Sequence, residues 1–283
     1  MRSRALALGT AQFLMLGFSL LPTLTLLLAS LVPDAESGAG LRLVLLARPT
    51  VANHANAIAL LLRNDSGDGH DVREYLLNTA IVATVATIAA GAVAIMAGML
   101  ATRFGFRFGK LLQYAALGGY AVPPLVLVVP YALIVKVAHV TSALVALIAA
   151  HVAFALPLAI WLAIQYFDGV AREWDTTAYV DGLSCTRAFA RVLLPQAWAG
   201  VATILVFTAI LSWNDVLFAL LLTADDSKTI SVGLQDAILS DSVTTDSSLA
   251  AAVIWVSLPL LAVVLAVEAL VARHLASDAG VTG

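Results

Sequence analysis

Six long apolar stretches alternate with shorter polar segments along this chain of 283 residues. Each stretch holds the roughly 18 or more residues that a helix needs to cross a bilayer. The stretches cover residues 6–32, 77–101, 111–135, 142–167, 198–223 and 249–272. The third contains Pro123, Pro124 and Pro130, which must kink or interrupt its helix. The pattern therefore predicts an all-α membrane protein with about six transmembrane helices.

Composition supports this fold class and excludes others. The chain is 61% hydrophobic and 12% charged, with a mean hydropathy of +0.96, which leaves too little polar surface for a soluble domain of this length. A net charge of −3 without a basic tract gives no indication of nucleic-acid binding. The single cysteine, Cys185, excludes an internal disulfide and a thiolate metal cluster. The first apolar run, which reaches about Val32, is too long for the core of a cleaved signal peptide.

Lysine and arginine predict the orientation in the membrane, because they are enriched on the cytoplasmic side. With the N-terminus inside, nine of the 15 basic residues are cytoplasmic: Arg2, Arg4, Arg103, Arg107, Lys110, Arg172, Arg187, Arg191 and Arg273. Both termini are then cytoplasmic. We expect an N-terminal part, 1–76, with one span and an extracytoplasmic segment, and a core of five spans, 77–283. Two outer segments, 33–76 and 224–248, are acidic, and they are either solvated connectors or docking surfaces.

A polar segment, residues 168–195, separates the fourth and fifth spans on the cytoplasmic side. It predicts two short helices joined by a turn at Asp181-Gly182, with Asp168 and Ser184 as helix caps. On the second helix, apolar side chains at helical spacing form one face: Cys185, Ala188, Phe189 and Val192. The helix ends near Pro195. The pattern alone leaves two interpretations open, a helix resting on lipid or on its own bundle, and a handle for a soluble partner.

The same segment resembles the EAA loop of ATP-binding-cassette importer permeases, whose short cytoplasmic helix docks on an ATPase subunit. Five residues match that pattern in register: Ala178, Asp181, Gly182, Leu194 and Pro195. Further stretches resemble the carbohydrate branch of this family, the second permease of maltose-type systems: "LLNTAIVATVAT", "LSWND" at 211–215, "TISVGL" at 229–234, "SLAAAVIWVSLPLLAVVL" and "SDAGVTG". The resemblance covers roughly 75–283 and implies a type I importer permease, a binding-protein-dependent inner membrane component.

The chain departs from the family at the loop's Glu-Ala-Ala, where it has Thr176-Thr177-Ala178. The acid that faces the ATPase is therefore missing, and Glu173 or Asp175, within about one turn, is the candidate replacement. The resemblance makes these residues, together with Asp181, Gly182, Arg187 and Pro195, the expected ATPase-coupling set. It also makes the outer loop a contact for a solute-binding protein, with Ile230, Val232, Leu234 and Gln235 as candidates.

Inside the spans, polar residues indicate function, because lipid exposure of a charge is costly. Trp213, Asn214 and Asp215 must face protein or water, so they either line a translocation pathway or bond neighbouring helices. His151 in the fourth span is interpreted as a packing or hydrogen-bonding group. No pair of histidines has ligand spacing, so no metal site is predicted.

The resemblance implies a permease subunit that forms half of a pathway for a sugar or sugar derivative and has no catalytic activity. Its expected partners are a second homologous permease, a dimer of ATPase subunits and a solute-binding protein. No phosphate-binding loop is present in the sequence, so we expect no cofactor here and ATP with Mg²⁺ on the ATPase. The alternatives are an importer for glycerol phosphate, an amino acid or a polyamine, or a carrier or enzyme outside this family.

Overall fold

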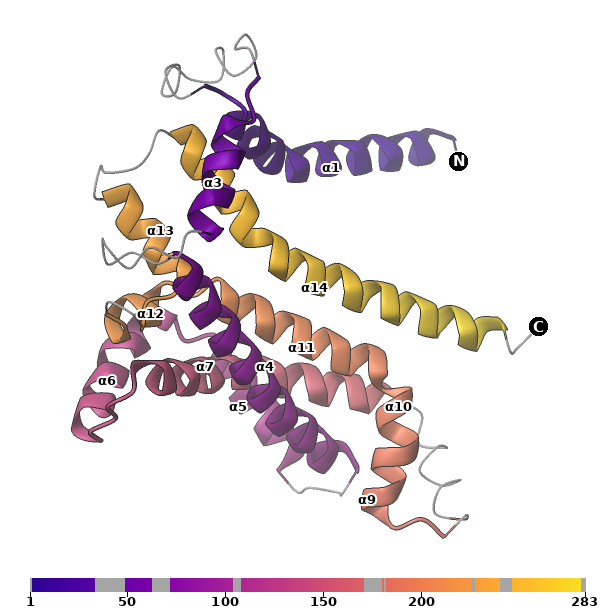
Figure 1. The fold of residues 1–283 in the computed structure, drawn as a ribbon. Helices are drawn as coiled ribbons and strands as arrows, with labels where there is room; N and C mark the ends of the chain where they lie inside the picture. Colours follow the sequence, from indigo (N-terminus) through magenta and orange to yellow (C-terminus); the bar gives the residue numbers. More distant parts are fainter. Residues whose placement is uncertain are drawn as a thin grey trace. The chain divides into compact units, whose positions relative to one another are not determined.

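The computed structural model describes residues 2–33, 49–62, 72–103, 108–170, 180, 182–224, 227–239 and 246–280. These residues form helices and connecting turns, with no strand among them, as Figure 1 shows. The chain divides into two compact units, one of residues 1–74 and 233–259 and the other of residues 75–232 and 260–283. The all-α prediction is confirmed.

The first unit contains α1 (Arg2–Ser30) and α3 (Ala52–Leu62). Asn53 helps to hold α3 to the end of α1, because its Nδ2 donates to the carbonyl oxygens of Ser30 at 3.0 Å and Val32 at 2.7 Å. His54 lies between Ser30, whose Oγ is 3.0 Å from Nε2, and Trp255, whose indole N–H donates to Nδ1 over 3.2 Å. The outer segment expected as a connector or docking surface therefore holds a helix that is anchored to the first span.

The second unit is built from helices that follow one another along the chain (Figure 1). They are α5 (Gly109–Tyr120), α6 (Pro124–Val137), α7 (Ala143–Gly169), α9 (Cys185–Ala188), α10 (Leu194–Gln196), α11 (Trp198–Trp213) and α12 (Leu217–Leu222). Three more helices cross the division between the units: α4 (Val72–Arg103), α13 (Ile230–Leu239) and α14 (Asp246–Gly280).

Among the residues that the structure describes, three helices, α4, α7 and α14, are long and apolar enough to cross a membrane, and two bent pairs bring the number to as many as five. One pair is α5 with α6, bent by 94°, and the other joins the segment 185–196 to α11 with a bend of 78°. The first predicted span corresponds to α1, which is apolar over Leu14–Ser30. Large apolar side chains are exposed along these helices, as expected where lipid is the solvent.

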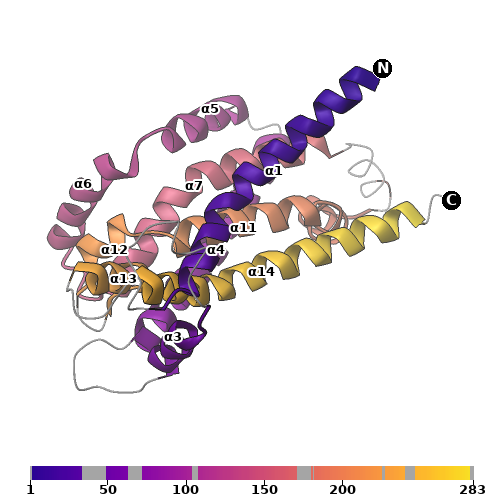
Figure 2. The ribbon, with the colours of Figure 1, turned by 90° about the horizontal axis from the view of Figure 1, so that it is seen from above.

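The bend between α5 and α6 confirms the predicted interruption of the third span, and Figure 2 shows the change of direction. Pro124 occupies the first turn of α6, where its missing N–H costs no hydrogen bond. Pro123 precedes it in extended conformation and excludes a continuous helix from α5. Pro130 is accommodated inside α6.

Two clusters form the core of the second unit. One joins α4, α6, α7, α12 and the start of α13 through Val82, Val128, Leu147, Ala150, Phe218, Ala219 and Val232. The other joins α4, α7 and α11 through Ala94, Ala159, Ala163, Phe167, Ala197 and Ile204. Small residues dominate the second cluster, so the backbones of these helices approach closely, as is usual between membrane helices. The first cluster fixes α12 against α7, which positions the polar site described next.

Candidate functional site

The predicted fifth span is a broken helix, interrupted over residues 214–216. α11 ends at Trp213, and α12 begins at Leu217. At the break, the Asp215 carboxylate accepts backbone N–H groups from Phe218 at 3.4 Å and Ala219 at 3.0 Å. Asp215 lies one residue before the N-cap, Val216, and its side chain satisfies N–H groups that the first turn of α12 leaves open. Asp215 therefore starts α12 and is held in place by it.

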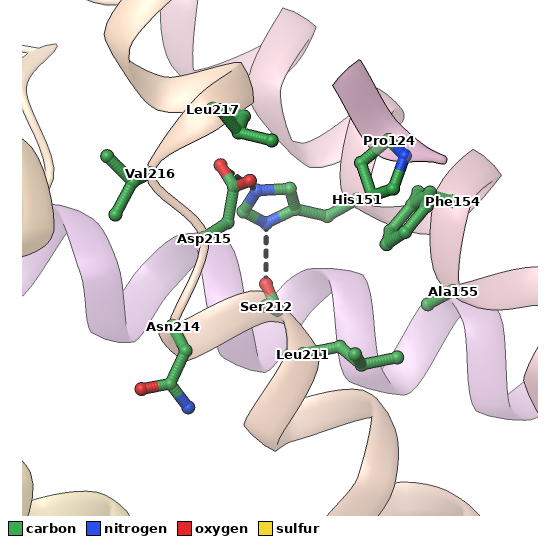
Figure 3. Close-up of a pocket in the computed structure, with 10 residues that line it drawn as sticks. All are labelled: Pro124, His151, Phe154, Ala155, Leu211, Ser212, Asn214, Asp215, Val216 and Leu217. Atoms are coloured by element: carbon green, nitrogen blue, oxygen red, sulfur yellow. Dashed lines mark hydrogen bonds and ion pairs between the residues drawn. The ribbon is translucent and has the colours of Figure 1, made fainter. Parts of the chain in front are cut away.

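A buried histidine from α7 meets this break. Nδ1 of His151 lies 2.6 Å from the Ser212 hydroxyl, and Nε2 lies 3.1 Å from Oδ2 of Asp215 (Figure 3). The side chains of His151 and Asp215 are only 4% and 13% exposed. The contact with Asp215 is close but poorly aligned, and Nε2 has no hydrogen bond to any described residue. Nε2 therefore meets Asp215 in a close polar contact that falls short of a hydrogen bond.

That cavity measures about 200 Å³. Its lining comes from the start of α6, from α7 and from the α11–α12 break: Pro124, His151, Phe154, Ala155, Leu211, Ser212, Asn214, Asp215, Val216 and Leu217. Apolar side chains make most of the wall, and a few polar groups converge on one side (Figure 3). Such a mixture is typical of small-molecule sites, in which apolar walls give contact and a few polar atoms give orientation.

Two of the three residues expected on a pathway line this cavity. Asp215 faces it beside His151, whereas the Asn214 side chain points away from His151 and donates to the Ile210 carbonyl at 2.8 Å (Figure 3). Trp213 is not among the lining residues, and its carbonyl accepts from the Ser231 hydroxyl at 3.4 Å. A pathway role for these three stays a prediction.

His151 and Ser212 were not recognised as site residues from the sequence. His151 was expected to pack or to bond another helix, and it does contact α11, but it also lines the cavity. Asp215 could have pointed to His151 in the sequence, because a carboxylate inside a span needs a polar partner. His151 is an ionisable side chain in the preceding span.

The cytoplasmic segment has the predicted turn. Gly182 has φ of +76°, a conformation that side chains with a Cβ rarely adopt, and α9 begins three residues later. Ser184 occupies the N-cap position, but its hydroxyl makes no capping bond and lies 3.5 Å from that of Thr186. The helix continues through a π-helical turn, 189–193, into α10, where Pro195 is exposed.

The predicted apolar face of this segment packs on its own bundle. Ala188 is buried, and the ring of Phe189 lies 5.7 Å from that of Phe167 on α7, centroid to centroid. Arg187 and Arg191 are exposed on the other side. The helix therefore packs on its own bundle, as one of the two interpretations from the sequence expected. The side that carries Arg187 and Arg191 remains accessible to a partner.

Six of the expected coupling residues lie outside the described residues: Glu173, Asp175, Thr176, Thr177, Ala178 and Asp181. The prediction that Asp168 caps a helix after the fourth span was wrong. α7 continues through Gly169, so Asp168 lies in the last turn of that span.

In the outer loop, two expected docking residues turn out to be packing residues. Ile230 and Val232 are each 2% exposed, and Val232 belongs to the core cluster with Phe218. The Ile230 N–H donates to the Thr79 hydroxyl at 2.9 Å. As buried side chains they cannot contact a partner without unpacking. Leu234 and Gln235 are half-buried and keep part of their surface accessible.

No group of three or more His, Cys, Asp or Glu side chains is placed to hold a metal ion within the part of the chain that the structure describes. Cys185 is half-buried at the start of α9.

Similarity to characterised sequences agrees with this architecture. The chain is 28% identical to the trehalose transport system permease protein of Mycobacterium tuberculosis, over 98% of this chain and 97% of that protein. It is 29% identical to the diacetylchitobiose uptake system permease protein of Streptomyces coelicolor, over 56% of this chain. The chain spans 52% to 59% of the length of three of the curated relatives it matches.

The fold matches that of one chain in the crystal structure of a bacterial ABC transporter that imports the acidic polysaccharide alginate. The TM-score is 0.69 at 17% identity, covering 94% of this chain and 96% of that one. This likeness shows the type I permease fold. Residues 91–277, which contain the cytoplasmic segment, the broken helix and the last span, match the family model as a whole. The chain therefore belongs to the family of binding-protein-dependent transport system inner membrane components.

Proposed function

We propose that the chain is one transmembrane subunit of an ATP-driven importer for a sugar or sugar derivative. The observation that carries the proposal is the cavity at the α11–α12 break, where Asp215 and His151 face a space of about 200 Å³ inside an apolar helix bundle. Buried ionisable groups at a helix break are a feature of membrane transport sites. The names of the relatives, which transport trehalose and diacetylchitobiose, support a sugar as the substrate class.

In this proposal the subunit forms half of the translocation pathway. A second, homologous permease supplies the other half, and the cavity lies on the wall between them. Transport follows alternating access, in which the helix bundles reorient around the substrate. The broken fifth span and the bent α5–α6 pair are the places where this subunit can change shape with few hydrogen bonds lost.

The cytoplasmic segment 168–195 is proposed to couple the subunit to a dimer of ATPases, which bind ATP and Mg²⁺. Its inner side already packs on the bundle through Phe189, so force applied to the segment is passed to α7. Its exposed side presents Arg187 and Arg191. Glu173 or Asp175 is proposed to replace the acid that the family carries in this loop.

On the opposite side, a solute-binding protein is proposed to dock on the outer loop. Ile230 and Val232 anchor the start of α13, so contacts with the partner come from residues such as Leu234 and Gln235. This arrangement requires both termini to be cytoplasmic, in agreement with the distribution of lysine and arginine.

The test is purification of the subunit with the ATPase and second permease that its host expresses alongside it, followed by reconstitution in liposomes. A sugar importer hydrolyses ATP faster when its binding protein carries a sugar than when the protein is empty or carries an amino acid. Failure to co-purify with an ATPase would refute the importer, whereas stimulation only by an amino acid or polyamine would refute the sugar.

A further inference from the structure

The cavity at the α11–α12 break is lined by a carboxylate and by no lysine or arginine. Among its ten lining residues are the carboxylate of Asp215 and the imidazole of His151, and none is a lysine or arginine (Figure 3). Anionic sugars in proteins are usually held by arginine or lysine, because only these supply full positive charge at every physiological pH. The wall therefore lacks the groups that an acidic sugar requires.

The negative charge is fixed in position. The oxygens of Asp215 accept the N–H groups of Phe218 and Ala219, so the carboxylate cannot swing away without uncapping α12. With 13% of its side chain exposed, Asp215 is also poorly screened by water. A second carboxylate brought into the cavity would meet this charge at close range and in a medium of low polarity.

The remaining polar groups suit hydroxyls. His151 is 4% exposed, its Nδ1 lies 2.6 Å from the Ser212 hydroxyl, and its Nε2 lies 3.1 Å from Oδ2 of Asp215. Sugar hydroxyls can donate to the carboxylate oxygens of Asp215 and exchange hydrogen bonds with the hydroxyl of Ser212. Phe154 supplies an aromatic wall against which the C–H face of a sugar ring can pack. The volume equals that of about seven water molecules in the liquid, which is room for one sugar ring.

We infer that this cavity is a charge-selective subsite, in which Asp215 admits a single ring of a neutral or amino sugar and rejects sugars that bear a carboxylate. The inference rests on the proposed function, since it assigns a substrate charge class to the proposed pathway. It concerns the permease itself and is independent of any selection made by a binding protein.

The experiment measures sugar binding to the permease–ATPase complex in nanodiscs, without binding protein, by saturation-transfer NMR. The probes are three matched pairs: glucose and glucuronate, galactose and galacturonate, and mannose and mannuronate. Within a pair that binds, the uronate should bind at least about tenfold more weakly than the neutral sugar. Two carboxylates about 6 Å apart at an effective dielectric near 20 repel each other with an energy larger than the one that lowers affinity tenfold.

Two variants locate the effect. Asp215→Asn removes the charge but keeps an oxygen that can accept the N–H groups of α12. In this variant the neutral sugar and its uronate should bind with nearly equal affinity, so the ratio of the two affinities should be close to one. Glu268→Gln removes one negative charge from an exposed residue of α14 that does not line the cavity, and it should leave the ratio unchanged.

Equal binding of a sugar and its uronate by the unmodified complex overturns the inference, and this measurement needs no variant to fold. An unchanged ratio in Asp215→Asn overturns the role of Asp215. Binding of none of the six sugars overturns the cavity as a sugar subsite, while the proposed function is still decided separately by co-purification and by sugar-stimulated ATP hydrolysis.

Discussion

The guanidinium of Arg103, at the end of α4, donates through Nη2 to the carbonyl oxygen of Phe167, at the end of α7, over 3.1 Å. The same nitrogen donates to the Val170 carbonyl at 2.8 Å. These carbonyls belong to the last turn of α7 and the residue after it, where few intrahelical donors remain, and the Phe167 oxygen also accepts the Val170 N–H at 3.3 Å. A cation at this place also interacts favourably with the negative end of the helix dipole. Arg103 therefore ties two spans together at the edge of the cytoplasmic segment.

Replacing Arg103 by methionine should destabilise the protein by about 1–3 kcal/mol, because the carbonyls lose a charged donor in a partly buried position. Thermal unfolding of the purified permease subunit in detergent, without the ATPase, measures the loss as a lower Tm. Arg191→Met is the matched control: it makes the same substitution at an exposed residue of the cytoplasmic segment, and it should leave Tm almost unchanged. Equal Tm values for both variants would show that the Arg103 contacts contribute nothing.

Much of this fold follows from hydropathy and from proline. A membrane helix makes its backbone hydrogen bonds within itself, so a long apolar run is enough to predict it. Pro123-Pro124 excludes a continuous helix between α5 and α6 in any surroundings. Gly182 likewise marks its turn locally, and its φ of +76° confirms that prediction. These features depend on residues that are neighbours in the sequence.

Features that depend on how helices rotate against one another did not follow from the sequence. His151 and Asp215 are 64 positions apart, and their contact exists only because α7 and the α11–α12 break pack in one orientation. The same holds for Ile230 and Val232, whose apolar character suits a docking surface and a core equally well. Their burial against residues of α4 and α12 decides between the two.

The turn at Gly182 allows a test of the proposed coupling. Gly182→Val forces a β-branched residue into positive φ, which is strongly disfavoured. No atom of the described residues lies within 4 Å of the position that a Cβ would take, so the expected effect comes from the backbone conformation. We expect normal membrane insertion and reduced co-purification of the ATPase. Gly182→Asn should retain more ATPase, because asparagine tolerates this conformation. Full ATPase recovery with Gly182→Val would refute the role of the turn.

Close packing between α7 and α11 depends on Gly200. A Cβ at this position would overlap the ring of Tyr166, which is too rigid to move aside at low cost. Gly200→Ala should therefore destabilise the protein by about 1–3 kcal/mol, as overpacking of a tight interface usually does. Gly118→Ala is the control, since a methyl group there meets nothing within 4 Å. The expected result is a lower Tm for Gly200→Ala alone, and an unchanged Tm would mean that the two helices separate easily.

Orientation can be tested with two exposed residues in a Cys185→Ser background. Val51→Cys places a thiol at the start of α3, which is expected outside, and Arg187→Cys places one on the segment 168–195, which is expected inside. With cytoplasmic termini, a membrane-impermeant maleimide should label position 51 in intact cells and position 187 only after permeabilisation. The reverse result would invert the topology and place the segment 168–195 on the side that lacks ATPases.

Anchoring of the outer segment depends on Asn53, which is 1% exposed and donates from one nitrogen to two carbonyl oxygens at the end of α1. Asn53→Asp keeps the shape of the side chain but replaces the donor by an acceptor. Three oxygens would then face one another in a buried site, which should destabilise the attachment of α3 to α1 by about 2–4 kcal/mol. We therefore expect α3 to detach. Asn56→Asp, at an exposed position of the same helix, makes the identical chemical change without this contact. Limited proteolysis from the outer side measures detachment: faster cleavage of residues 49–62 is expected in Asn53→Asp but not in Asn56→Asp. Equal protection in both variants would show that contacts other than the Asn53 hydrogen bonds, such as that of His54 with Ser30, hold α3 to the first span.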